Sequence, residues 1–155
     1  MKKGMVLVAA VMLAAVMMLA GCSQGAKEVD VDALAKQLAS EVTYAEQLES
    51  IDAATAERVY QIDAADVTTA AAGVGTGATV DEYSVWQAVD SAAAGRIKAA
   101  AEARIASQKE MYADYNPGEV PKLDGAVIVQ SGNYVAVCIT ADTENAKKII
   151  DGALK

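Results

Sequence analysis

A chain of 155 residues with 13 Lys and Arg, 21 Asp and Glu and no His carries a net charge of −8. Without His it can form neither a Ser-His-Asp triad nor a His-ligated zinc site. The excess of acidic residues argues against a nucleic-acid partner, because binding to phosphates needs clustered Lys and Arg. The length allows one domain rather than two.

The first 21 residues have the pattern of an export signal. Two lysines follow the initial Met, residues 5–20 form an unbroken apolar run, and Gly21 and Cys22 come next. A charged start, an apolar run and small residues before a cleavage point are typical of secretory signals. The run is shorter than the roughly 20 apolar residues that a membrane-spanning helix needs. We therefore expect residues 1–21 to be a signal peptide.

The end of this segment, Leu19-Ala20-Gly21-Cys22, resembles the lipobox of bacterial lipoproteins. Small residues allow an extended backbone to enter a peptidase groove, and Cys22 supplies a thiol for a diacylglyceryl group. The resemblance implies cleavage between Gly21 and Cys22, which leaves Cys22 as the lipidated N-terminus. Two alternatives are an uncleaved membrane anchor and a plain secretory signal with a chance Cys.

A lipidated Cys22 would hold the protein to a membrane without a spanning helix, since two acyl chains anchor a protein stably and one does so marginally. Residues 22–29 then form the lipidated Cys and a polar tether, and residues 30–155 form the domain. The polar stretch 23–28 reaches at most about 20 Å from the bilayer. We expect the domain to lie on the outer face of the cytoplasmic membrane.

The sequence contains two cysteines, Cys22 and Cys138, and both follow the expected signal peptide. With Cys22 lipidated, no intramolecular disulfide can form, so the core must be stable without one. Cys138 alternates with aliphatic residues in a predicted strand, which favours a small buried hydrophobe over a reactive thiol. Phe is absent from the chain and Ala is abundant, which predicts a small core.

The first half of the domain predicts helices followed by strands. Asp30 or Asp32 can cap a helix whose apolar residues lie on one face up to Val42, and a second short helix is expected over 53–59. Residues 60–63 are expected to be a short extended piece. Strands are expected over 67–74 and 80–89. In the second strand Tyr83 and Val85 have one parity, Glu82 and Ser84 have the other, and Trp86 falls on the polar side.

The second half begins with the longest helical pattern, over 91–115, which ends at Asn116-Pro117-Gly118. A loop is expected up to residue 125. Residues 126–130 and 134–140 are rich in β-branched residues and are joined through Ser131-Gly132-Asn133, which predicts a hairpin. Asp142 or Thr143 then caps a last amphipathic helix that ends near Leu154.

Taken together, the elements predict an α+β fold in a single small domain. Their order is α-(α)-β-β-α-β-β-α. We expect an antiparallel sheet of about four strands, in two hairpins, packed against three to four helices that cover one face of the sheet.

The order of four short segments resembles that of an uncharacterised family of small lipoproteins of Gram-positive bacteria, known only as a domain of unknown function. These segments are Val85…Asp90, Arg104…Gln108, Tyr115-Asn-Pro117 and Gly132-Asn-Tyr134-Val. The resemblance implies a location and domain limits, and it brings no activity with it.

Three residues are candidates for facing a ligand: Trp86, Tyr115 and Gly75. Tyr and Trp are amphipathic and enriched at binding surfaces, although they could equally fill a core that lacks Phe. The run Gly73-x-Gly75-x-Gly77 lacks the G-x-G-x-x-G spacing of a dinucleotide loop, which favours a turn between two strands.

Without a catalytic set, the sequence favours a binding or interaction module that is not an enzyme. Its partner would be an envelope protein or a small ligand, and we expect no metal site and no cofactor beyond the lipid. One alternative is an envelope hydrolase that uses carboxylates such as Asp63 or Asp142. Another is a purely structural lipoprotein.

Overall fold

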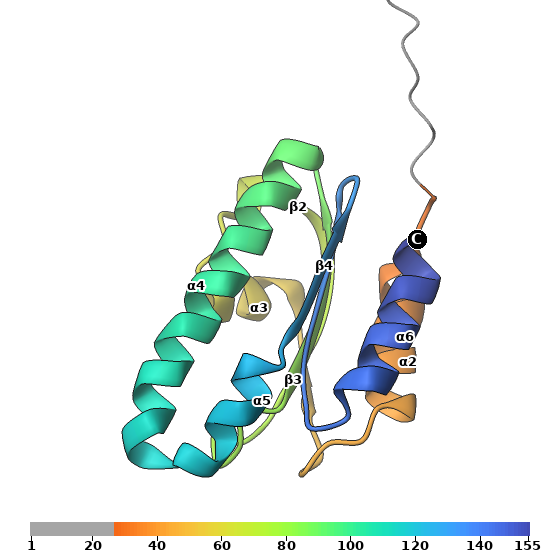
Figure 1. Ribbon diagram of the computed structural model, residues 1–155. Coiled ribbons are helices and arrows are strands. Elements are labelled where there is room, and N and C mark those ends of the chain that lie inside the picture. Colours follow the sequence, from red (N-terminus) through yellow and green to blue (C-terminus); the bar gives the residue numbers. More distant parts are fainter. Residues whose placement is uncertain (1–26) are drawn as a thin grey trace, which may run out of the picture.

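The computed structural model describes residues 27–155, in which a β-sheet lies between two layers of helices (Figure 1). The expected signal peptide at 1–21, its cleavage point after Gly21 and the lipidated Cys22 lie outside the described residues. The α+β class and the single small domain are confirmed.

The sheet is antiparallel throughout and has the strand order β1-β2-β3-β5-β4. The predicted hairpin between β4 and β5 is confirmed, and Gly132 in its turn adopts a φ of 57° that disfavours a side chain. The fifth strand, the short edge strand β1, was not predicted. The strands are β1 (Glu49–Ile51), β2 (Val67–Val74), β3 (Glu82–Ala88), β4 (Val127–Ser131) and β5 (Tyr134–Ile139).

One face of the sheet is covered by α2 (Val31–Glu41) and α6 (Thr143–Leu154), which pack against each other as well as on the strands (Figure 1). Leu38 and Ile150 are fully buried here against Val85. Asp30 caps α2 by accepting a hydrogen bond from the backbone N–H of Ala33 at 2.9 Å. This layer is the one that the apolar parity of β3 predicts.

The opposite face is covered by α3 (Ala53–Tyr60), the long α4 (Ser91–Tyr115) and the short α5 (Val120–Asp124) (Figure 1). Asp90 caps α4 by accepting from the N–H of Ala93 at 2.7 Å. Small residues such as Ala93 and Ala101 are fully buried along α4, which lets the helix approach the sheet closely. None of the helices within residues 27–155 is both long and apolar enough to cross a membrane.

The second helical layer corrects the expectation that helices cover one face only. The parity of β3 that looked polar is buried under α4. It is compatible with burial because its polar groups have partners: the indole N–H of Trp86 donates to the Ser84 hydroxyl at 2.8 Å, and Glu82 pairs with Arg104. In the sequence, the polar residues on this buried face of β3 therefore resembled residues on a face exposed to solvent.

Two local predictions were also wrong. Residues 60–63 do not form an extended piece: Tyr60 ends α3 and Gln61 adopts a left-handed φ of 55° as its C-cap, whereas Asp63 has an extended backbone. The stretch predicted as a loop before residue 125 contains a 3₁₀ turn and α5. Asp142 stands at the N-cap of α6, but its side chain instead accepts from the N–H of Thr43.

We expect Gly73→Ala to destabilise the protein. A Cβ at this position of β2 would overlap the ring of Tyr83, which is itself buried, and overpacking of this kind costs about 1–3 kcal/mol. Gly95→Ala is the matched control, because a Cβ there meets open space within α4 and should stabilise the helix by about 0.5–1 kcal/mol. Urea unfolding of both variants measures the difference, and equal effects would contradict this packing.

Candidate functional site

Trp86 does not face a ligand. Its side chain is fully buried between the sheet and α4, and its ring lies edge-on to that of Tyr60 with the centroids 5.4 Å apart. This burial overturns the expectation for Trp86 and favours the alternative, in which the residue fills a core without Phe.

Tyr115 and Gly75 lie near the same end of the sheet. Tyr115 is 68 % exposed at the end of α4, and its ring packs edge-on against Tyr112. The Tyr112 hydroxyl donates to the carbonyls of Gly77 and Thr79, at 2.8 and 3.0 Å. The loop that contains Gly75 is therefore in contact with the end of α4, whereas Trp86 lies apart from them in the core.

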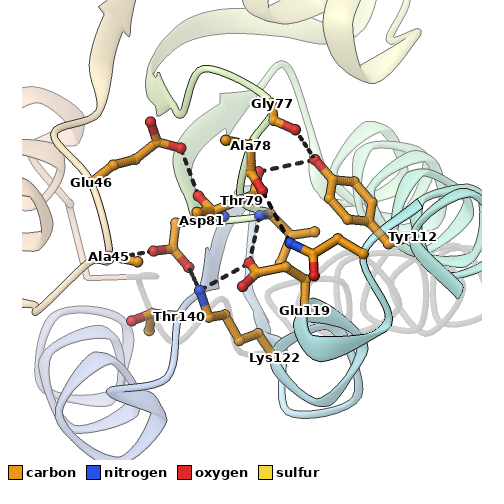
Figure 2. A network of polar contacts seen from close by, with 12 residues as sticks. Ala45, Glu46, Gly77, Ala78, Thr79, Asp81, Tyr112, Glu119, Lys122 and Thr140 are labelled. Carbon is orange, nitrogen blue, oxygen red and sulfur yellow. Dashed lines mark hydrogen bonds and ion pairs between the residues drawn. The ribbon is translucent and has the colours of Figure 1, made fainter. Parts of the chain in front are cut away.

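The loop between β2 and β3 is held by a polar network around Asp81 (Figure 2). The Asp81 carboxylate is buried and accepts hydrogen bonds from the N–H of Ala45 at 2.6 Å and from Lys122 Nζ at 2.9 Å. Lys122 also pairs with Glu119, which accepts from the N–H of Val80 at 3.0 Å. The network joins α5 to the start of β3 and leaves these charges paired.

Glu46 closes the other side of this loop (Figure 2). Its carboxylate accepts from the hydroxyls of Thr79 and Thr76, at 2.7 and 2.8 Å, and these bonds lower the pKa of Glu46. A Cβ at Gly75 would collide with this carboxylate. The predicted turn between two strands is thus confirmed. The backbone near Gly75 faces the carboxylate of Glu46, whose negative charge would repel a phosphate.

An open groove of about 430 Å³ runs between α3 and α4, and a second hollow of about 260 Å³ continues it toward the loop after β2. Arg104, Gln108 and Met111, all on α4, line both. The groove is further lined by the end of α3 and by small α4 residues: Val59, Tyr60, Gln61, Ala100, Ala103 and Ser107.

Arg104, which lines both hollows, forms an ion pair with the buried Glu82, which lines the second hollow. The guanidinium donates twice to the carboxylate, from Nε at 3.1 Å and from NH2 at 2.7 Å. The Tyr60 hydroxyl donates to the same carboxylate at 2.9 Å, and burial together with the nearby charge of Glu82 raises the pKa of Tyr60. This geometry holds Glu82 as a fully hydrogen-bonded acceptor.

Arg104 has further contacts that fix its position. NH1 donates to the carbonyl of Val59 at 3.3 Å, and the guanidinium lies 5.1 Å from the centre of the Tyr60 ring. The side-chain amide of Gln108 donates weakly to Glu82 at 3.5 Å. Within residues 27–155, Gln108 Oε1 is buried and has no hydrogen-bond partner.

Sequence reasoning named Arg104 and Gln108 only as part of a family resemblance. Their spacing of four residues on a helix was a usable signal, because it puts both on one face of α4. Glu82 was not identified from the sequence as the partner of Arg104. It lies on the side of β3 that looked polar, so it was not expected to be buried in an ion pair.

The carboxylates proposed for a hydrolase lie elsewhere. Asp63 accepts from the N–H of Ala65 at 2.9 Å, Asp142 accepts from Thr43 at 3.0 Å, and neither lines the groove. In the part of the chain that the structure describes, no three His, Cys, Asp or Glu residues gather as a metal site would require. Cys138 is fully buried, as predicted, and burial raises the pKa of its thiol to about 12.

In a comparison with known families, a domain of unknown function, DUF4358, matches residues 40–140. The matched range lies within the predicted domain of residues 30–155 and contains the whole groove. No curated protein and no solved structure matches the chain.

We expect Arg104→Met to lower the free energy of unfolding by about 3 kcal/mol, because it leaves the buried carboxylate of Glu82 without its partner. Arg96→Met is the matched control on the same helix. Arg96 also pairs with a carboxylate, that of Asp66, but its side chain is 60 % exposed, so its loss should cost less than about 1 kcal/mol. Urea unfolding at neutral pH compares them, and similar losses would show that the buried pair has no special role.

Proposed function

The chain belongs to the DUF4358 family, and we propose that it is a lipid-anchored binding module outside the cytoplasmic membrane, with the groove between α3 and α4 as its ligand site. The anchor is proposed from the sequence, and the ligand site from the geometry of the groove. The observation that supports the ligand site is that Gln108, which lines this open groove beside Arg104, has a buried side-chain oxygen with no hydrogen-bond partner among the described residues.

The lipobox at 19–22 supports the anchor. The thiol of Cys22 would take a diacylglyceryl group, and removal of residues 1–21 would take two lysines with it, changing the net charge from −8 to −10. An acidic domain is repelled by anionic lipid headgroups. The domain would therefore stand away from the bilayer on its tether and leave its surface open to the envelope.

The position of the chain entry is compatible with a ligand site in the groove. Lys27 Nζ donates to the carbonyl of Gly152, so the chain enters the domain beside the end of α6 (Figure 1). The groove lies in the opposite helical layer, across the sheet. A tether that leaves from Lys27 would therefore not cover the groove.

The groove itself suits binding better than hydrolysis. The carboxylate nearest to it, that of Glu82 in the adjoining hollow, is already bound by Arg104 and Tyr60. Met111 is 58 % exposed at its rim and offers a flexible apolar surface. A binding role uses both features, whereas neither supports the hydrolase or the purely structural alternative.

We expect the native protein, purified from bacterial membranes, to begin at Cys22 with a diacylglyceryl group on the thiol. Cys22→Ser should abolish this added mass, because a hydroxyl does not replace the thiol in the transfer. Cys138→Ala is the matched control and should keep the lipid. Mass spectrometry of the three proteins tests the anchor, and an unmodified full-length chain from the cytosol would refute it.

We expect low-molecular-weight extract of the bacterial envelope to raise the melting temperature of the lipidated protein. Ala103→Trp should abolish the shift, since Ala103 lines the groove and a Trp would fill it. Ala106→Trp is the matched control, on an exposed position of α4 that does not line the groove. The absence of a shift in the natural protein, or an equal shift in both variants, would contradict a ligand site here.

A further inference from the structure

We infer that the groove recognises a neutral peptide amide: a C=O group that accepts from Arg104 next to an N–H group that donates to Gln108. This inference rests on the proposed function of the groove as a ligand site and names the chemistry of its ligand. It follows from which hydrogen-bonding groups of α4 are already used within the protein and which remain.

The acceptor in this pair is Gln108 Oε1. The side chain of Gln108 lines both hollows, the residue is only 8 % exposed, and the amide nitrogen already points to Glu82. Within residues 27–155 its oxygen has no donor. Nearly all buried polar atoms in native proteins have a partner, so a partner supplied by a ligand accounts for this exception.

The donor is the guanidinium of Arg104. Of its five N–H groups, one on Nε, one on NH1 and one on NH2 are used by Glu82 and Val59. In the part of the chain that the structure describes, two N–H groups remain, on a side chain that is 23 % exposed and lines the groove. Arg104 and Gln108 are four residues apart on α4, so their side chains are neighbours on one face of the helix, and both line the groove.

The charges around this pair disfavour an anionic ligand. Glu82 already neutralises Arg104, and a carboxylate or phosphate bound to Arg104 would lie close to both the Glu82 carboxylate and the Gln108 oxygen. A cation would lie against the guanidinium. A neutral group with one acceptor and one donor avoids both repulsions, and the amide is the common biological group of this kind.

The walls favour a peptide over an amide-bearing sugar. Small apolar side chains, those of Val59, Ala100 and Ala103, line the groove. Its aromatic ring, that of Tyr60, is only 2 % exposed and cannot serve as a stacking platform for a sugar. Met111 lines both hollows beside Gln108, and its flexible apolar side chain can adapt to a peptide.

The test compares three probes by ¹H–¹⁵N NMR of the lipidated protein in detergent micelles: N-acetyl-alanine methylamide, N-acetylglucosamine and acetate. The peptide probe should shift the side-chain signals of Gln108 and Arg104 in a saturable way, with a Kd at least tenfold lower than those of the other two. Gln108→Met should raise the Kd for the peptide probe about tenfold, the effect of losing one buried hydrogen bond of roughly 1.4 kcal/mol. Glu110→Met, on an exposed position of α4, should leave it unchanged.

Tighter or equal binding of acetate or N-acetylglucosamine at Gln108 would overturn the peptide assignment. So would unaltered binding of the peptide probe to Gln108→Met. If no probe shifts Gln108 while the envelope extract still raises the melting temperature and Ala103→Trp still blocks that shift, the amide inference fails and the proposed ligand site stands. If Gln108→Met does not fold, the ranking of the three probes on the natural protein decides.

Discussion

The buried carboxylate of Glu82 sets the arrangement of this domain. It stands at the start of the central strand, on the face under α4, where a lone charge would be very costly. Arg104 from α4 and Tyr60 from the end of α3 supply the required partners. One acidic group thereby fixes how both helices sit on the sheet and holds Arg104 in place beside the groove that separates them.

Burial of β3 and β5 on both faces explains how a chain poor in bulky side chains builds a stable domain. The two strands serve two cores at once, with Val85 and Cys138 on the side of α2 and α6 and with Trp86 and Val137 on the side of α4. Alanines along α4 bring the helix close enough to the sheet to fill the remaining space. The same layering keeps the groove and the chain entry at Lys27 on different sides of the sheet.

Most of the fold could be predicted from local patterns, and the two errors that concern the candidate site share one cause. The extent of α4, the hairpin at Gly132 and the strand β2 follow from periodicity and turn chemistry alone. The second helical layer could not be predicted, because Glu82 and Ser84 look like solvent-facing residues until their partners, 22 residues away in one case, are known. Trp86 was misjudged for the same reason. The candidate site depends on this long-range pairing, so sequence reasoning named Arg104 and Gln108 without giving them a role.

Two polar networks lie near each other in this domain. They differ in whether all their hydrogen-bonding groups have a partner, and we use this difference to distinguish a structural network from a candidate binding site. Around Asp81, the carboxylate and Lys122 bind each other and neighbouring groups, so the network holds the loop after β2 closed. Around Glu82, the carboxylate is fully paired, yet Arg104 keeps two N–H groups and Gln108 keeps an oxygen without a partner in the described residues. A network that serves stability alone gains by pairing every buried group. The hydrogen-bonding capacity that Arg104 and Gln108 keep beside the open groove is therefore the observation on which the proposed ligand site rests.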